Sequence, residues 1–451
     1  MAHPSRRTVL ALAAGAVIAG TARAQAATAV GTALSVTQFA VKPDLATDQS
    51  VAIQKAIDSA ATSRLPLFFP AGAYRAGNLA LRSGSRLSGV PGLSRLVHAS
   101  GGVLLAGSGI GNAGVEGLVF DGAGRALASG QGTLAFTDGQ AIRIRDCTVT
   151  GSAGHGIALT RVGGEVSGCT LVGAAQTALF ALDSRGLAIR SNSVEGAGNN
   201  GIQVWRSAAG EDGTLVLGNR ITGVQARDGG SGQNGNGINI YRAGNVIVAD
   251  NRISVCAFSA VRGNAASNLQ VRGNSCTGLG EVAIFIEFGF QGAVIAGNLV
   301  DDAAVGICVT NFNEGGRLAT VEGNLIRNLA VRYPPGTDPG GSAGIGIIVE
   351  ADASVSGNVV EGAPDVGIRL GYGPYLRDIT VTGNVVRNSS IGIGVSLVVG
   401  AGTAIIAANT ISGAQRGAVM GLNQSGPTTG DLLAAGAAVD PRLTLSANRT
   451  R

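Results

Sequence analysis

Carboxyl, phenol and guanidinium side chains recur at matching positions of short strand-like segments in the middle of the chain. Glu287 ends one such segment and Glu350 ends another, whereas Tyr241 and Arg262 lie in two segments between Asn236 and Asn264. A protonated carboxyl group acting with a carboxylate can hydrolyse a glycosidic bond. A phenol beside an arginine can instead remove the proton next to a uronate carboxylate, which is lyase chemistry. These four residues are the catalytic candidates.

Aromatic and amide side chains gather around these candidates. Trp205 is the single tryptophan of the chain, and Tyr241, Phe285 and Phe288 follow it. Aromatic rings can stack on sugar faces while amides bind hydroxyl groups. The alternative is an aromatic ladder that covers the outside of the fold. On the first interpretation the substrate-binding candidates are Gln203, Trp205, Arg206, Asn239, Arg242 and Asn264.

The elements that must position these residues repeat along the chain. In each repeat, aliphatic residues alternate with variable ones, which is typical of a strand with one buried face. A second segment of each repeat carries a recurrent asparagine, whose place two cysteines take near the start. Its positions are Cys147, Cys169, Asn192, Asn219, Asn251, Asn274, Asn298, Asn324, Asn358, Asn384 and Asn409. Such spacing predicts a parallel solenoid of about a dozen coils, with the asparagines in an internal hydrogen-bonding ladder.

Aligning the repeats places the outward residues in two columns. One column contains Ala158, Phe180, Gln203, Asn239, Arg262, Phe285, Cys308, Ile348 and Arg369, and the other contains Thr160, Leu182, Trp205, Tyr241, Asn264, Glu287, Thr310, Glu350 and Gly371. At roughly 4.8 Å per coil, Glu287 and Glu350 would lie roughly 9 to 10 Å apart. Two insertions, Gln225–Gly235 and Val331–Gly341, leave the same corner of the coil and are expected to wall a cleft.

The first 24 residues have the features of an export signal. Arg6 and Arg7 precede an apolar run from Leu10 to Gly20, and Ala22-Arg-Ala24 is a small-x-small cleavage site. This pattern predicts export by the twin-arginine machinery to a bacterial periplasm or beyond, the alternative being an ordinary secretory leader. No later segment has 18 uninterrupted apolar residues, so no membrane span is expected after cleavage.

Charge and side-chain chemistry exclude several other classes. Cleavage would remove three of the 33 basic residues and no acidic residue, lowering the formal net charge from +5 to +2. Lysine occurs only at Lys42 and Lys55, so nucleic-acid binding is not expected. The five cysteines and three histidines have no metal-ligand spacing, so we expect no metal or cofactor, apart from Ca²⁺ if the protein is a lyase. We expect buried thiols, although Cys147 and Cys169 are spaced so that a disulfide is an alternative.

One amphipathic helix precedes the repeats and carries a family resemblance. Ala52, Ile53, Ala56, Ile57 and Ala60 share one face, which predicts a helix with Thr47 or Asp48 as N-cap that closes the end of the solenoid. This helix, followed by Leu67-Phe-Phe-Pro-Ala-Gly-Ala-Tyr-Arg75, resembles the opening of the pectate-lyase-like family. The resemblance implies a right-handed parallel β-helix. The whole chain is similar to uncharacterised twin-arginine-translocated repeat proteins of α-proteobacteria.

The expected organisation is a signal peptide over 1–24, a lead-in and capping helix over 25–64, a parallel β-helix over 65–425, and a C-terminal cover or tail over 426–451. The expected function is binding, with cleavage, of a polysaccharide in a groove along the β-helix. Non-catalytic glycan binding is the alternative, because one fold of this kind hosts both. Gly154-His155-Gly156 and Asp301-Asp302 resemble elements of polygalacturonases, but their order is reversed here, and His155 is interpreted as a turn residue.

Overall fold

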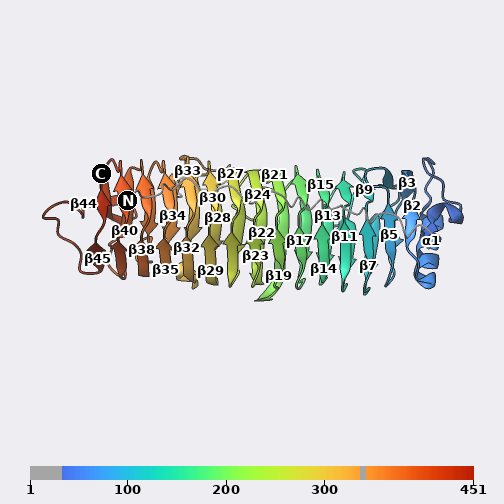
Figure 1. Cartoon of the computed structure of the whole chain (residues 1–451), viewed down its shortest axis with the longest axis horizontal. Coiled ribbons are helices and arrows are strands. Elements are labelled where there is room, and N and C mark those ends of the chain that lie inside the picture. Colours follow the sequence, from blue (N-terminus) through green and yellow to red (C-terminus); the bar gives the residue numbers. More distant parts are fainter. Residues whose placement is uncertain (1–32, 336–341) are drawn as a thin grey trace, which may run out of the picture.

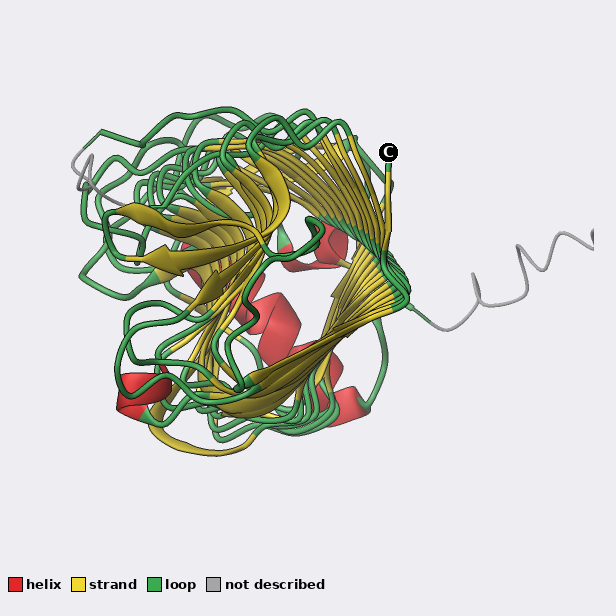
Figure 2. Cartoon of the chain, turned by 90° about the vertical axis from the view of Figure 1, so that its left-hand side faces the viewer, coloured by secondary structure: helices red, strands yellow, loops and turns green. Residues whose placement is uncertain are grey.

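The computed structural model describes residues 33–335 and 342–451, and these form one parallel β-helix capped by a helix (Figure 1). The predicted all-β solenoid is confirmed. The predicted signal peptide lies outside the described residues. Three sheets run along the molecule, with 16 strands in sheet A and 15 each in sheets B and C, and every coil contributes one strand to each. Viewed along the axis, the sheets form three walls around the interior (Figure 2).

Sheet C carries the candidate residues. Its strands, in spatial order, are β4 (Leu79–Ala80), β7 (Leu105–Ser108), β10 (Gly132–Thr137), β13 (His155–Thr160), β16 (Thr177–Leu182), β19 (Asn200–Glu211), β22 (Asn236–Gly244), β25 (Val261–Asn264), β28 (Val282–Glu287), β31 (Val305–Val309), β34 (Ile345–Val349), β37 (Val366–Leu370), β40 (Ile391–Ser396), β43 (Gly417–Asn423) and β44 (Gly426–Asp431).

Sheet A contains β1 (Leu34–Ser35), β2 (Leu67–Phe69), β5 (Arg86–Gly89), β8 (Gly114–Glu116), β11 (Ile142–Arg145), β14 (Gly164–Ser167), β17 (Ala188–Arg190), β20 (Leu215–Leu217), β23 (Ile247–Ala249), β26 (Leu269–Arg272), β29 (Gln291–Ala296), β32 (Arg317–Glu322), β35 (Ala351–Ser356), β38 (Arg377–Thr382), β41 (Ala404–Ala407) and β45 (Leu443–Ser446).

Sheet B contains β3 (Gly72–Ala76), β6 (Ser94–His98), β9 (Val119–Asp121), β12 (Thr148–Thr150), β15 (Thr170–Val172), β18 (Ser193–Glu195), β21 (Arg220–Val224), β24 (Arg252–Cys256), β27 (Ser275–Leu279), β30 (Leu299–Asp301), β33 (Leu325–Arg327), β36 (Val359–Glu361), β39 (Val385–Arg387), β42 (Thr410–Ser412) and β46 (Arg449–Thr450).

The interior is filled by the inward set of alternate residues. Ile202 and Val204 of β19, for example, are fully buried, as are their counterparts Ile238 and Ile240 in β22. At the turn between sheets A and B, the predicted asparagine ladder is confirmed. Asn274 donates from Nδ2 to Asn298 Oδ1 at 3.0 Å, and the same contact recurs from Asn192 to Asn448. All five cysteines are buried free thiols.

The two ends of the β-helix are closed differently. Helix α1 (Ser50–Ser63) buries Ile53, Ala56, Ile57 and Ala60 against the first coils, while its N-cap residue is Gln49, without a capping side-chain bond. At the other end β44 pairs antiparallel with β43 as a cover. Strands β45 and β46 then extend sheets A and B, so the β-helix continues past residue 425, where the sequence pattern fades.

Candidate functional site

The outward face of sheet C has the predicted register. Strand pairing places Gln203, Asn239, Arg262, Phe285, Cys308, Ile348 and Arg369 in one column, and Trp205, Tyr241, Asn264 and Glu287 in the other. Glu350 directly follows β34, which lies two coils beyond β28. The tandem coils therefore align in one column residues that are up to 166 positions apart in sequence, from Gln203 to Arg369.

Two pockets lie along this face. The first, here called the Trp205 pocket, has a volume of about 420 Å³ and is lined by Trp205, Asn239, Tyr241, Asn264 and Phe288, together with Arg262, Glu287 and the loop residues Ser231, Gly232 and Gln233. The second, the Tyr372 pocket, has a volume of about 580 Å³ and includes Glu281, Phe285, Cys308, Glu350, Arg369, Tyr372 and Tyr375. Ser231 lines both pockets, so they are adjacent.

Both insertions border these pockets, as the sequence predicted. The first contributes Ser231, Gly232 and Gln233, and the described part of the second contributes Arg332, Tyr333 and Pro334. Buried asparagines hold the first loop in place, since Asn236 Nδ2 donates to the carbonyl of Gly232 at 2.8 Å and Asn200 Nδ2 to that of Gln233 at 3.2 Å. The wall formed by the first insertion is therefore fixed to the strands beneath it.

Arg262 is the centre of a buried ion cluster between the pockets. Its Nε and Nη2 donate to the two oxygens of Glu287 at 2.7 and 2.9 Å, and its Nη1 to Glu281 at 3.1 Å. The side chains of Arg262 and Glu287 are only 9% and 4% exposed. Burial disfavours the charged guanidinium, but the hydrogen bonds and charge of Glu287, with the charge of Glu281, outweigh it and raise the pKa of Arg262. For Glu281 burial acts in the other direction: it raises the pKa of the carboxyl group, and the charge of Arg262 offsets this only in part.

Glu350 is a buried carboxyl group at the border of the Tyr372 pocket. Thr310 Oγ1 donates to its Oε1 at 2.5 Å, and the backbone N–H of Phe312 donates to its Oε2 at 2.8 Å. Burial raises the pKa of Glu350, and these hydrogen bonds oppose the shift only in part. The group is thus disposed to hold a proton at higher pH than an exposed glutamate does.

The aromatic residues form a continuous stripe that leads into the Trp205 pocket. His155 stacks on Phe180 with ring centroids 4.7 Å apart, Phe180 contacts Trp205 at 5.8 Å, and Trp205 contacts Tyr241 at 5.5 Å. Trp205 Nε1 donates to Asn239 Oδ1 at 2.9 Å, which fixes the indole ring. The geometry fits both interpretations of these rings. Each ring packs on its neighbour, as in an aromatic ladder, and Trp205 and Tyr241 also line the pocket, where a sugar could stack.

Three predicted binding residues do not line either pocket. Gln203 is buried and accepts a hydrogen bond from Thr177 Oγ1 at 2.5 Å. Arg206 reaches the carbonyl of Ser184 at 3.5 Å, and Arg242 reaches that of Ser207 at 3.0 Å while stacking over Tyr241. Arg206 and Arg242 lie past the point where the neighbouring strands end, because β19 and β22 are longer than those strands.

Sequence reasoning missed the second half of the site. Glu281 precedes β28, and Tyr372 and Tyr375 lie in the turn after β37. Arg369 stacks over Tyr372 at 5.1 Å, and it has no hydrogen bond or ion pair to any residue in the described ranges. Arg369 was already in the predicted outward column, so its position in that column could have identified it as a pocket residue. Tyr372 and Tyr375 lie outside the repeat and carried no periodic signal.

The remaining candidates have structural contacts. His155 accepts a hydrogen bond from the backbone N–H of Thr177 at Nδ1, and burial lowers its pKa to about 4. Asp301 pairs with Arg327, and Asp302 with Arg332. Over the described part of the chain, no three Asp, Glu, His or Cys side chains are grouped so that they would hold a metal such as Ca²⁺. No helix there is long and apolar enough to cross a membrane.

Comparison with known families decides the handedness of the β-helix and the family to which the chain belongs. The model of the right-handed β-helix region matches residues 94–221 and 155–326, which together cover more than half of the chain. The chain belongs to this right-handed β-helix family. The model described as rhamnogalacturonase A/epimerase, pectate lyase-like, matches residues 33–113, and so the pectate-lyase-like resemblance is confirmed. No curated protein matches the sequence closely enough to refine this assignment.

Solved structures with the same fold have diverse roles. The chain is similar to the N-terminal fragment of bacteriophage phi29 gene product 12, at 14% identity, with 92% of this chain and 70% of that one covered and a TM-score of 0.56. It is similar to the Dettilon tailspike protein at 16% identity, 86% and 68% coverage and a TM-score of 0.50. It also matches the A-module of the mannuronan C-5 epimerase AlgE6 of Azotobacter vinelandii, at 16% identity, 93% and 99% coverage and a TM-score of 0.49. At such identities the first two matches establish the shared fold alone.

Proposed function

We propose that this protein binds a polysaccharide chain along sheet C, across the Trp205 and Tyr372 pockets. The observation that carries the proposal is the aromatic stripe, which leads to Trp205 and Tyr241 beside the amide groups of Asn239 and Asn264. Aromatic faces beside a few fixed polar groups are what a sugar ring needs for stacking and for hydrogen bonding of its hydroxyl groups.

The charges of the groove favour a neutral glycan over a uronate polymer. Arg262 is already neutralised by two glutamates, and Arg332 pairs with Asp302. Glu350 adds a further acidic group near Arg369. Because Arg262 and Arg332 are paired with carboxyl groups and Glu350 lies near Arg369, which has no ion pair within the described ranges, a polyanion would gain little attraction there and would meet buried acidic groups.

Hydrolysis of the bound glycan is the second candidate, and the raised pKa of Glu350 is the observation that favours it. Glu350 would donate its proton to the glycosidic oxygen while Glu287 accepts the proton of the attacking water. Two coils separate them by roughly 9 to 10 Å, at the upper end of the separation for inversion. A lyase mechanism is less well supported, since Arg262 would have to leave both glutamates to neutralise a uronate.

Titration of the mature protein, from Gln25, with neutral polysaccharides tests the binding proposal. Trp205 is the only tryptophan, so its fluorescence reports occupancy of its own pocket. Trp205→Ala, followed by calorimetry, is expected to weaken binding about tenfold or more, as for a central aromatic contact. Phe39→Ala, a half-buried aromatic beside the capping helix that lines neither pocket, is the matched control and should bind normally. Equal affinity of the two variants for the polysaccharide would refute the proposal that it binds in this groove.

Release of reducing ends tests the second candidate. Hydrolysis should be lost in Glu350→Gln and in Glu287→Gln without loss of binding. Binding with no new reducing ends on any substrate would assign the protein to the non-catalytic class. Unsaturated uronate products would instead establish a lyase, and Tyr241→Phe would then identify its base.

We also propose that the chain is exported by the twin-arginine route and acts in the periplasm or outside the cell, as a twin-arginine-translocated repeat protein. Arg6-Arg7 before the apolar run supports this. Replacing both arginines with lysine should retain a fused reporter inside the cell, while continued export would indicate the general secretory route.

A further inference from the structure

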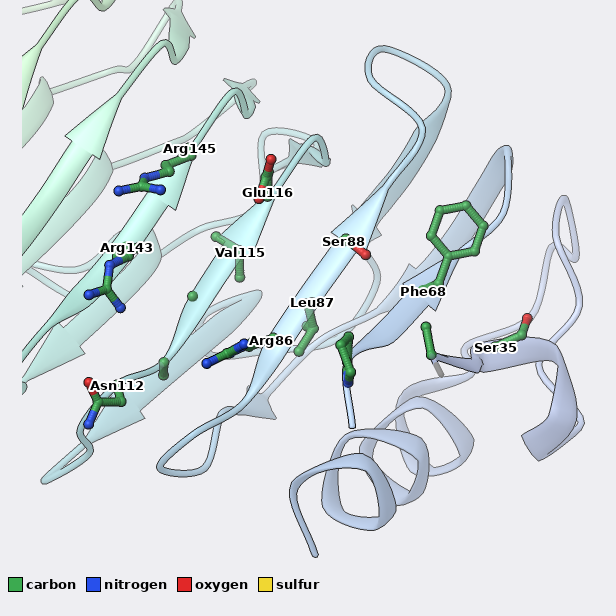
Figure 3. Close-up of a pocket in the computed structure, with 14 residues that line it drawn as sticks. Ser35, Phe68, Arg86, Leu87, Ser88, Asn112, Val115, Glu116, Arg143 and Arg145 are labelled. Carbon is green, nitrogen blue, oxygen red and sulfur yellow. The ribbon is translucent and has the colours of Figure 1, made fainter. Parts of the chain in front are cut away.

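A third pocket lies on a different face, on the first coils of sheet A. It has a volume of about 780 Å³ and extends from Ser35 in β1 and Phe68 in β2 to Arg143 in β11 (Figure 3). Strands β1, β2, β5, β8 and β11 are consecutive neighbours in this sheet, so the pocket crosses five strands along the axis of the β-helix. Nothing in the proposed function of sheet C uses this surface.

Two arginines face this pocket with a glycine between them. Strand pairing places Arg86 opposite Gly114, and Gly114 opposite Arg143. A Cβ at Gly114 would lie only 3.1 Å from the carbonyl oxygen of Arg143 and 3.4 Å from its Cβ. The glycine therefore places no side chain between these two arginines, whose strands are two coils, roughly 9 to 10 Å, apart.

These two arginines differ from the others on the same face. Arg145 and Arg190 both pair with Glu165, at 2.5 Å each. Within residues 33–335 and 342–451, neither Arg86 nor Arg143 has an ion-pair partner or a side-chain hydrogen bond. Figure 3 shows Arg86 and Arg143 on the side of the pocket where Asn112 lies, with Arg145 next to Arg143 and Phe68 on the far side.

From this geometry we infer that the sheet A pocket binds an acidic polysaccharide chain that runs along the β-helix. Anionic groups of the chain pair with Arg86 and Arg143, Asn112 binds a hydroxyl group, and Phe68 packs against a sugar face further along. Among the described residues, the unpaired positive charge of the pocket is confined to two arginines, since Arg145 pairs with Glu165, and Glu116 adds one carboxylate to the lining. Two spaced cations fit a linear polymer with spaced anionic groups. A nucleic acid needs a wider basic footprint, and this chain has two lysines in all.

Affinity measurement with polyuronate oligosaccharides by calorimetry tests the inference, using the mature protein. Arg86→Ser with Arg143→Ser is expected to weaken binding at least tenfold, because two charge-assisted contacts are lost. Both side chains are exposed, so the fold should persist, as circular dichroism would verify. Arg190→Ser is the matched control, since Arg190 is also an exposed sheet A arginine but is paired and outside the pocket. It should bind normally.

The salt response and competitors separate the outcomes. Polyuronate binding should weaken as ionic strength rises, and Trp205→Ala should leave it unchanged, which distinguishes this pocket from the groove on sheet C. Equal affinity of the double variant and the parent protein would overturn the inference. Duplex DNA or a sulfated synthetic polymer bound as tightly as polyuronate would also overturn it, because the surface would then be a patch with no preference for sugar.

Discussion

Arg262 offers the sharpest test of how this face of sheet C is held together. Arg262→Met removes the guanidinium group but keeps much of the side-chain volume, and it leaves Glu287 buried without a counter-ion. Loss of one partner from a buried pair costs about 3–5 kcal/mol of unfolding free energy. The exposures of 9% for Arg262 and 4% for Glu287 place this pair in the buried class.

Urea unfolding followed by Trp205 fluorescence is the suitable assay. A solenoid is stabilised mainly by contacts between neighbouring coils, so a local probe is needed. Trp205 lies in β19, two strands from Arg262 in β25. The double variant with Glu287→Met should recover most of the lost stability, because replacing both members of a buried pair with apolar residues is often neutral.

Arg327→Met is the control, since its ion pair with Asp301 has an arginine side chain that is 47% exposed. An exposed pair contributes about 0.2–1 kcal/mol. If Arg262→Met costs no more than Arg327→Met, or if the double variant is no more stable than the single one, the cluster is effectively solvated and the reasoning fails.

Three further predictions concern other parts of the site and its scaffold. Because burial raises the pKa of Glu350 above its ordinary value of 4.5, its contribution to stability is highest below pH 4.5 and is lost as pH rises through the folded-state pKa. The melting temperature of the parent protein should therefore fall as pH rises through this range, and that of Glu350→Gln should fall less. Parallel melting curves against pH for the two proteins would contradict the raised pKa of Glu350. Asn274→Ala should cost about 2–5 kcal/mol in urea unfolding, because its amide bonds two buried backbone groups. Asn274→Cys should cost less, since cysteine fills this slot elsewhere, and equal costs would argue against the ladder. Gly232→Ala should weaken glycan binding, because its Cβ would lie 1.7 Å from Nη1 of Arg262. Gly229→Ala shares the positive φ without that contact and is the control in the same titration, where equal losses would point to backbone strain alone.

The repeat pattern was sufficient to predict the fold and the outward register. Alternation fixes which side chains face the interior, and a slip of one residue would bury the charged set. The same constraint placed Arg262 beside Phe285 and set Glu287 and Glu350 two coils apart. The asparagine ladder was predictable for the same reason, because a buried amide at a repeated turn has its partners in the adjacent coils.

Pairing between side chains was decided only by the tertiary structure. The sequence offered Arg262 and Glu287 as separate candidates, and nothing in it indicated that they neutralise each other, since partner choice depends on rotamers and burial. Tyr372 and Tyr375 reach the site from an irregular turn without periodicity. On sheet A, the sequence did not distinguish Arg86 and Arg143 from Arg145. Glu165 lies opposite Arg143 in the strand register but pairs with Arg145 and Arg190, and only the side-chain conformations of the folded chain leave Arg86 and Arg143 without an ion pair among the described residues.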